Sequence, residues 1–313
     1  MWFISLRDLV YRRRRFVIAI VGTAAVFAMA LVLAGMAAGF RVEAERTQAG
    51  IGADAWVVPT GVPGPWTSFR TMPAALAAVV AKEPGVRAAS PLIHLRQSVH
   101  QGSKLVDVNV FGHVIGGLGE PPAAEGALED GPGQVLVDSK LGAHIGDRIV
   151  IGRWTYRVTG LVHGMTATSG IPTVWMPLQD AQTMGFGGQP FTTAIITRGV
   201  PREVPAGLVV VSNDAAIEDS LRPLQSGIQS ISSSKTFLWV IAAIIIGAVV
   251  YLSTLERVRD FAVLKAVGAS SRDLFLGLAA QSVVVALVVG LLASLVGLRK
   301  AITVDPALAF GGN

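Results

Sequence analysis

The sequence contains no cysteine among its 313 residues, and charged residues make up only 15% of it. Without cysteine the chain forms no disulfide, no thiolate nucleophile and no cysteine-ligated metal site. So low a charged fraction, with 51% hydrophobic residues and a mean hydropathy of +0.56, is unusual for a water-soluble domain. The composition therefore predicts a membrane protein.

Motifs for enzymatic chemistry are also missing. The sequence has no Gly-x-x-x-x-Gly-Lys-[Ser/Thr] phosphate loop, so the chain does not hydrolyse ATP by that route. Its five histidines form no His-Glu-x-x-His pair, and no Gly-x-Ser-x-Gly elbow presents a serine. The acidic pairs Glu43/Glu45 and Glu129/Asp130 are interpreted as solvated charges. We expect no enzymatic activity and no metal or cofactor bound by this chain.

Three long apolar runs lack any charged residue: residues 16–40, 236–255 and 274–298. Each is long enough to cross roughly 30 Å of hydrocarbon, so we interpret them as membrane spans. Residues 41–235 between the first two runs carry 15 Lys and Arg against 16 Asp and Glu. The net charge of +5 therefore comes from the flanks of the runs, which indicates membrane orientation and excludes nucleic acid as a partner.

The basic residues set the orientation. Four arginines immediately precede the first run: Arg12, Arg13, Arg14 and Arg15. The positive-inside bias places residues 1–15 on the cytoplasmic side as an interfacial amphipathic helix, and residues 41–235 outside the cytoplasm. The second run then returns, which makes residues 256–273 cytoplasmic. The predicted location is the plasma membrane.

Alternating apolar patterns in residues 41–235 predict several strands, and helical patterns predict a few helices. The strands are expected at Asp54–Pro59, Leu105–Val114, Gln134–Asp138, Asp147–Ile151, Trp154–Val162, Thr173–Pro177, Thr192–Thr197 and Leu208–Val211, with a hairpin turn at Gly152-Arg153. Helices are expected at Pro73–Lys82, Leu178–Met184 and Asp214 to about Ser233. The predicted fold is an α-helical transmembrane bundle with a large α+β extracytoplasmic domain inserted between the first and second spans.

The segment 256–273 between two spans mixes charged and apolar residues. A helix leaving the membrane is expected to end at Gly268 in a left-handed conformation, and Ser270 with Asp273 forms a capping box for the next helix. The candidate docking residues are Glu256, Arg257, Arg259, Asp260, Phe261, Leu264, Lys265 and Gly268. Charge alone suits a loop held by anionic lipid, but an aromatic residue exposed to water favours a protein partner.

Two further features concern helix packing and topology. Gly35 and Gly39 form a small-x-x-x-small spacing, which suits either packing within the chain or a contact with a second copy. The third run ends at Arg299 and Lys300, and a single crossing would place these residues outside, against the positive-inside bias. Either the bias is broken here, or the chain crosses twice and a segment is missing from this sequence.

Several stretches resemble one family. These are ERVRDFAVLKAVGAS at 256–270, VDPALAF at 304–310, QVLVDS at 134–139, IGDRIVIG at 145–152 and YRVTG at 156–160. They are similar to segments of FtsX/MacB-like permeases, the membrane subunits of type VII ABC transporters, and the likeness is greatest to actinobacterial permeases described as glutamine transporters.

The resemblance implies that a dimer of cytosolic ATPases, which use ATP and Mg, docks on residues 256–272. It also implies that two permeases pair and that the second span transmits movement to the outer domain. Family members have four spans, whereas residues 282–300 here resemble the start of the third joined to the end of the fourth. About 35 to 40 residues are then missing, enough for one more crossing and its connection, and the tail 299–313 is cytoplasmic.

Two functions stay open at this point. The chain is either a permease subunit coupled to a cytosolic ATPase, for export or mechanical signalling, or a membrane-anchored extracytoplasmic scaffold or regulator of cell-envelope enzymes without an ATPase. A P-loop ATPase that co-purifies with the chain would distinguish the first from the second.

The predicted orientation is testable because the chain has no thiol of its own. A cysteine introduced by Lys265→Cys should react with a membrane-impermeant maleimide only after the cells are permeabilised. A cysteine introduced at Lys104, in the outer domain, should react in intact cells and is the matched control. Labelling of position 265 from outside intact cells would overturn the topology.

Overall fold

The structure is a computed structural model that describes residues 13–101, 104–121, 125–128, 131–256 and 258–268, with isolated positions from 270 to 295. These residues form two compact units, one made of residues 13–38 with the positions from 226 onward, the other of residues 39–225. The first unit is helical and the second, the outer unit, contains all the described strands.

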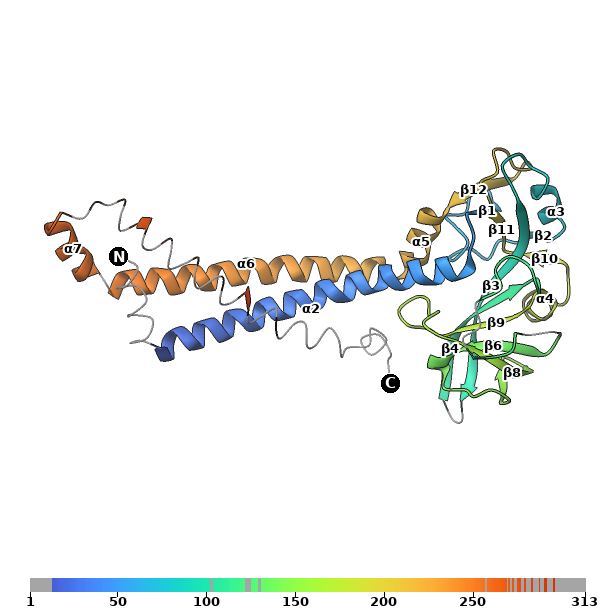
Figure 1. The fold of residues 1–313 in the computed structure, drawn as a ribbon, viewed down its shortest axis with the longest axis horizontal. Coiled ribbons are helices and arrows are strands. Elements are labelled where there is room, and N and C mark those ends of the chain that lie inside the picture. Colours follow the sequence, from blue (N-terminus) through green and yellow to red (C-terminus); the bar gives the residue numbers. More distant parts are fainter. Residues whose placement is uncertain are drawn as a thin grey trace. The chain divides into compact units, whose positions relative to one another are not determined.

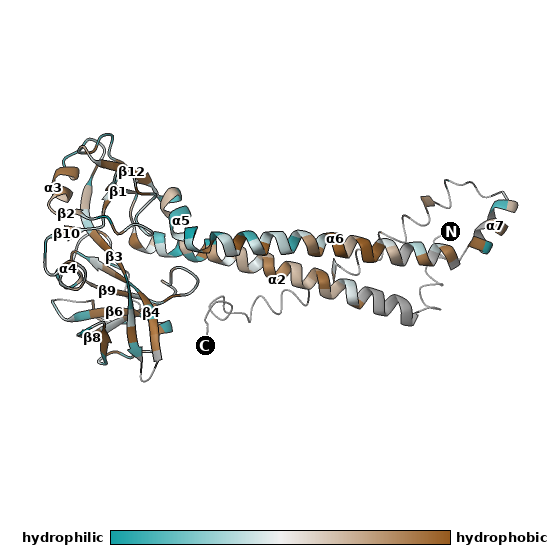
Figure 2. Ribbon diagram, turned by 180° about the vertical axis from the view of Figure 1, so that it is seen from behind, coloured by the Kyte–Doolittle hydropathy of each residue, from teal (hydrophilic) through white to brown (hydrophobic). Residues whose placement is uncertain are grey.

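Helices α2 (Arg13–Ile51), α6 (Gln225–Glu256) and α7 (Val258–Ala266) contain the described residues of the first two apolar runs and of the segment that follows. Among the described residues two stretches are long and apolar enough to cross a membrane, Val21–Ile51 and Asn213–Ala248. Only 22% and 6% of their most apolar windows are buried, unlike the core helix of a soluble protein. Figure 2 shows hydrophilic first turns of α6 followed by a hydrophobic stretch. The third run lies mostly outside the described residues, so the predicted span borders stay predictions.

Helices α2 and α6 contact each other through an aromatic pair. The rings of Phe27 and Trp239 meet edge to face at 4.9 Å. Small residues are buried on both helices: Thr23, Ala24, Ala28, Ala30 and Ala242. Gly35 is exposed, and a Cβ placed there would meet nothing within 4 Å, so this contact does not use it. The packing role predicted for Gly35 and Gly39 stays a prediction.

The outer unit is α+β, as expected. Its strands are β1 (Ala55–Pro59), β2 (Met72–Pro73), β3 (Ala88–Gln101), β4 (Lys104–His113), β5 (Glu125–Gly126), β6 (Gln134–Asp138), β7 (Arg148–Ile151), β8 (Trp154–Val162), β9 (Thr173–Pro177), β10 (Phe191–Thr192), β11 (Ala194–Arg198) and β12 (Leu208–Ser212). Its helices are α3 (Leu76–Val80), α4 (Leu178–Phe186) and α5 (Asn213–Leu221), with 3-10 turns η1 (Ser139–Leu141) and η2 (Arg222–Leu224). The predicted strands are confirmed with shifts of one or two residues, except that the run at 192–197 is divided between β10 and β11.

The sequence prediction missed β3, the longest strand. Pro91 and several polar residues interrupt its apolar pattern, and the strand changes partners along its length. Its first part, Ala88–Leu92, pairs with β11, and its second part, Ile93–Gln101, pairs with β4. In Figure 1, β3 accordingly runs from the group of β1, β11 and β12 into the group of β4, β6, β8 and β9.

Six strands close into a small barrel: the second part of β3, together with β4, β6, β7, β8 and β9. The pairings run from β3 to β4, β9, β6, β8 and β7, and β7 returns to β3 through Val99↔Ile151. The β7–β8 hairpin has the expected two-residue turn, in which Gly152 has a φ of +59°. Alternate side chains fill the interior, and Ala181 and Met184 of α4 pack against them.

The first group is a four-stranded antiparallel sheet in the order β12-β1-β11-β3. Both of its faces are covered. Val57 and Ile195 pack against Val80 of α3 on one face, and Trp56 and Ala216 of α5 belong to the core on the other. All five residues of β1 are therefore buried, which explains its continuous apolar run.

An aromatic cluster lies where the barrel meets the core between the sheet and α5. The ring of His94 lies 5.0 Å from that of Trp66 and stacks 5.1 Å from that of Phe111, which stacks on Trp175 at 4.4 Å. His94 is buried, and its Nε2 lies 3.0 Å from Oδ1 of Asn109. Burial in these apolar surroundings lowers the pKa of His94 to about 4, against the weaker upward effect of Asn109.

This burial makes the stability of the outer unit sensitive to acid. The folded state binds no proton at His94 between pH 6.5 and about 4, whereas the unfolded chain does, so stability is lost as the pH falls through this window. We expect a loss on the order of 3 kcal/mol from this group, measured by denaturant unfolding followed by tryptophan fluorescence. His94→Gln should flatten the pH dependence, while His144→Gln at an exposed histidine should keep it. Identical pH profiles for the two variants would contradict this assignment.

Candidate functional site

The predicted docking segment forms helix α7. Gly268 has a φ of +102°, as expected of the residue that ends a helix, and its N–H donates to the carbonyl oxygen of Lys265 at 3.0 Å. The N–H of Val267 donates to the carbonyl oxygen of Val263 at 3.1 Å. The segment is therefore a short helix with a defined end.

The structure describes some of the candidate docking residues. Arg259, Lys265 and Gly268 are exposed. Arg257 and the side chains of Glu256, Asp260, Phe261 and Leu264 lie outside the described residues. The structure adds exposed apolar residues that the sequence analysis did not single out: Val258, Val263 and Val267. Their signal, valines next to charged residues in one short segment, was present in the sequence. Docking at this helix stays a prediction.

The arginines that precede the first run are at the edge of the described chain. Arg13, Arg14 and Arg15 form the first turn of α2, although their side chains, and the whole of Arg12, lie outside what the structure describes. Their role in setting the topology stays a prediction.

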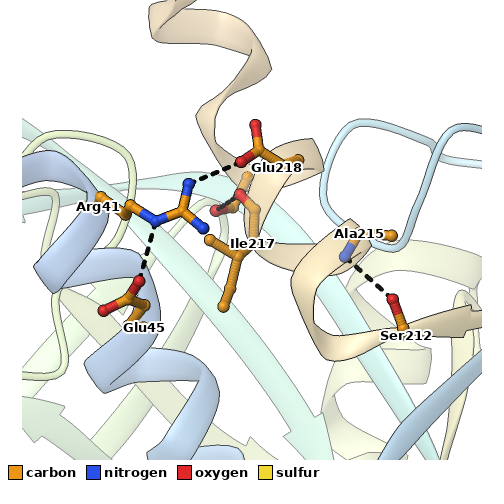
Figure 3. Close-up of polar contacts among 7 residues, drawn as sticks. Arg41, Glu45, Ser212, Ala215, Ile217 and Glu218 are labelled. Atoms are coloured by element: carbon orange, nitrogen blue, oxygen red, sulfur yellow. Dashed lines mark hydrogen bonds and ion pairs between the residues drawn. The ribbon is translucent and has the colours of Figure 1, made fainter.

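The most developed polar arrangement of the outer unit holds the end of α2 and the short helix α5 (Figure 3). Arg41 of α2 donates from Nε to Oε1 of Glu45 at 3.0 Å and from Nη1 to Oε1 of Glu218 at 2.8 Å. Helix α5 begins with Ser212 as N-cap, whose Oγ accepts from the N–H of Ala215 at 3.3 Å. The arginine thus joins the two helices. All three charged side chains are about half exposed, and ion pairs of this kind contribute little to the free energy of folding.

Asn213, at the start of α5, connects α2 with the sheet. Its Oδ1 accepts from Nε2 of Gln48 at 3.1 Å and from Nε1 of Trp56 at 3.2 Å. Its Nδ2 donates to the carbonyl oxygen of Ala53 at 2.6 Å. One amide side chain therefore bonds to α2, to the chain directly after it and to β1.

Asp219 fixes the other end of α5. Its carboxylate is buried and accepts from the N–H groups of Trp66 and Thr67 at 2.8 and 3.2 Å and from the Thr67 hydroxyl. Nε of Arg222 lies 3.3 Å from Oδ1. Gly64 approaches so closely that a Cβ there would lie 2.6 Å from the carboxylate. A buried carboxylate with this many donors is a strong anchor.

We call Arg41, Gln48, Asn213, Glu218 and Asp219 the helix seat. Sequence reasoning missed it and interpreted Glu43 and Glu45 as solvated. Glu45 instead pairs with Arg41, a contact that the i, i+4 spacing indicates, and Glu43 accepts from the N–H of Gly170 at 2.6 Å. No spacing in the sequence connects Asn213 or Asp219 to partners some 150 residues earlier.

The helix seat offers mechanical attachment rather than chemistry. Within the described ranges, no group of three or more His, Asp or Glu side chains is placed to hold a metal ion. The carboxylate of Asp219 is fully engaged by donors and covered by Gly64, so it is not available to a substrate.

Comparisons with known proteins agree along the whole chain. Residues 17–220 match the model of the MacB-like periplasmic core domain, and residues 234–306 match that of the FtsX-like permease C-terminal domain. The chain is 40% identical over 348 aligned positions to uncharacterized ABC transporter permeases of Mycobacterium bovis and Mycobacterium tuberculosis, with all of each chain covered. Among solved structures, the periplasmic region of MacB from Actinobacillus actinomycetemcomitans aligns with a TM-score of 0.40 and 12% identity, over 56% of this chain and 95% of that one.

The alignment with the mycobacterial permeases is longer than this chain. It has 348 positions against 313 residues, so 35 positions of the alignment have no residue here. The expected single missing segment stays a prediction. Its predicted place, near residues 285–290, stays a prediction.

The anchoring role of Asp219 is testable by substitution. Asp219→Ala leaves the buried N–H of Trp66 and the partly buried N–H of Thr67 without an acceptor, so we expect the free energy of unfolding of the outer unit to fall by about 3 kcal/mol. Asp214→Ala, on the exposed side of the same helix, should lower it by about 1 kcal/mol or less. Denaturant unfolding of the full chain in detergent measures both, and equal losses would show that Asp219 is no anchor.

Proposed function

Because the chain belongs to the family of FtsX/MacB-like ABC transporter permeases, we propose that it is the membrane subunit through which a separate cytosolic ATPase moves the outer unit. The ATPase dimer uses ATP and Mg, and the movement serves export or mechanical signalling. The observation that carries the proposal is that α2 is one helix of 39 residues, from the first apolar run to the helix seat.

The unbroken helices supply the physical argument for transmission. No proline occurs before Pro59, and Gly52, with a φ of +69°, is the residue at which α2 ends. A helix of this length spans about 58 Å and keeps its axial spacing, since every turn is hydrogen-bonded to the next. Displacement at one end of such a rod is therefore passed to the residues bonded at its other end.

Helix α7 supports the proposed docking. It combines exposed cations, Arg259 and Lys265, with exposed valines, and a short helix with a fixed end suits a groove on a partner protein. Anionic lipid would bind the cations but would gain nothing specific from the defined helix end at Gly268.

The pairing of two permeases and contact with lipid are further parts of the proposal. The open surface around Gly35 supports a second helix approaching α2, because a glycine without neighbours lets two backbones come close. Glutamine as a substrate rests on the resemblance alone, and a subunit that transmits movement needs no substrate path of its own.

Docking at α7 is testable by co-purification with a P-loop ATPase expressed together with the permease. Phe261→Asp and Leu264→Asp place a charge in the predicted interface, so we expect the recovered ATPase to fall by about tenfold or more. Val200→Asp adds the same charge at an exposed position of the outer unit, away from the predicted interface, and is the control. Unchanged recovery with the first two variants would contradict docking and favour the scaffold function.

A further inference from the structure

The loop between β8 and β9, residues 163–172, packs along one side of the last turns of α2. The N–H of Gly170 donates to Oε1 of Glu43 at 2.6 Å, and Oγ1 of Thr47 donates to the carbonyl oxygen of Thr166 at 2.6 Å. The methyl group of Met165 lies so close to Gly50 that no Cβ would fit there. Positions 43, 47 and 50 follow the i, i+4, i+7 spacing of a single helix face, so the loop contacts one face of α2.

The tip of this loop has an unfavourable backbone conformation. Thr168 and Ser169 have φ values of +53° and +74°, and Gly170 follows at +82°. The bridge between Ala167 and Ile171 closes the turn around them. These two are the positive-φ residues other than glycine in the described chain, and a β-branched residue such as Thr168 is rare in this region.

The buried hydroxyl of Ser169 adds to this cost. Its Oγ has no hydrogen-bond partner in the part of the chain that the structure describes, although the residue is only 9% exposed. A buried polar group without a partner disfavours the conformation that buries it. The strained turn therefore persists because other contacts hold it.

The base of the loop is attached to the barrel. The N–H of Met165 donates to Oδ2 of Asp138 at 2.9 Å, and the N–H of Asn109 donates to the carbonyl oxygen of Pro172 at 2.9 Å. The loop therefore connects two parts of the outer unit, with its base on the barrel and its tip on α2.

We propose that the turn Ala167–Ile171 is a strained latch, which Glu43 and Thr47 hold closed and which opens when α2 rotates or shifts. Both residues lie on one face, so a single rotation of α2 carries them away from the loop together. Thr168 and Ser169 are then free to take ordinary φ values, and the Ser169 hydroxyl becomes solvated. The inference rests on the proposed function, since the latch opens only if α2 moves. In this proposal the latch regulates how the movement of α2 reaches the barrel.

The closed state is tested by hydrogen exchange of the full chain in detergent, followed in peptides covering 165–172. Glu43→Ala removes one of the two bonds that α2 makes to the loop, so exchange of the Gly170 amide should accelerate by about tenfold. Val42→Ala, at the neighbouring exposed position of the same helix, should leave it unchanged. Equal exchange in the two variants would overturn the latch.

The strain is tested by Thr168→Gly and Ser169→Gly. Glycine adopts positive φ freely, so both variants should keep the turn closed and slow exchange of the Ala167 and Ile171 amides by about threefold or more. Faster exchange in both variants would show that the turn is unstrained and would also overturn the latch.

The regulatory role is tested in the complex with the ATPase. Addition of ATP should accelerate exchange in peptides covering 165–172 of the unsubstituted protein, and less so in Thr168→Gly. If the ATPase binds and hydrolyses ATP without any change at this loop, the latch is wrong and the proposed function stands. If no ATPase binds, the proposed function fails, and the regulatory role fails with it.

Discussion

A helix that leaves an apolar run and enters a folded domain needs polar partners at its end that are themselves fully bonded. In this protein Asn213 of α5 bonds in this way to the end of α2, and Asp219 attaches α5 itself to a neighbouring segment. Asn213 bonds to α2 and to β1, and Asp219 takes the N–H groups of the segment at Trp66 and Thr67.

Strand β3 extends this attachment through the outer unit. Because it belongs both to the antiparallel sheet and to the closed barrel, the two cores share one backbone rather than meeting at a flexible linker. The aromatic stack of Trp66, His94, Phe111 and Trp175 fills the junction. The loop that grips α2 starts from this same barrel, so it stands on a rigid base.

The contacts of α2 and the contacts of α5 differ in how much free energy is needed to break them. The pairs that Arg41 makes are half exposed, so they orient α2 and α5 at small cost and exchange readily with water. Asp219 is buried and its bonds are costly to break. Helix α5 is thus held firmly, while the contacts along α2, including the strained turn at Thr168, are the ones that a moving helix can remake. This division suits the proposed role, in which the chain stays folded while it transmits motion.

The sequence by itself determined the apolar runs, the family and most local structure, since these depend on neighbouring residues. The β7–β8 hairpin at Gly152 and the helix end at Gly268 follow from the backbone freedom of glycine. Pro223 belongs to η2 and interrupts the single helix expected from Asp214, for an equally local reason. Only the tertiary structure decided the path of β3, the partners of Asn213 and Asp219 and the conformation of Thr168. Each joins segments far apart in the chain, and no periodicity reports which distant donor will face a buried carboxylate.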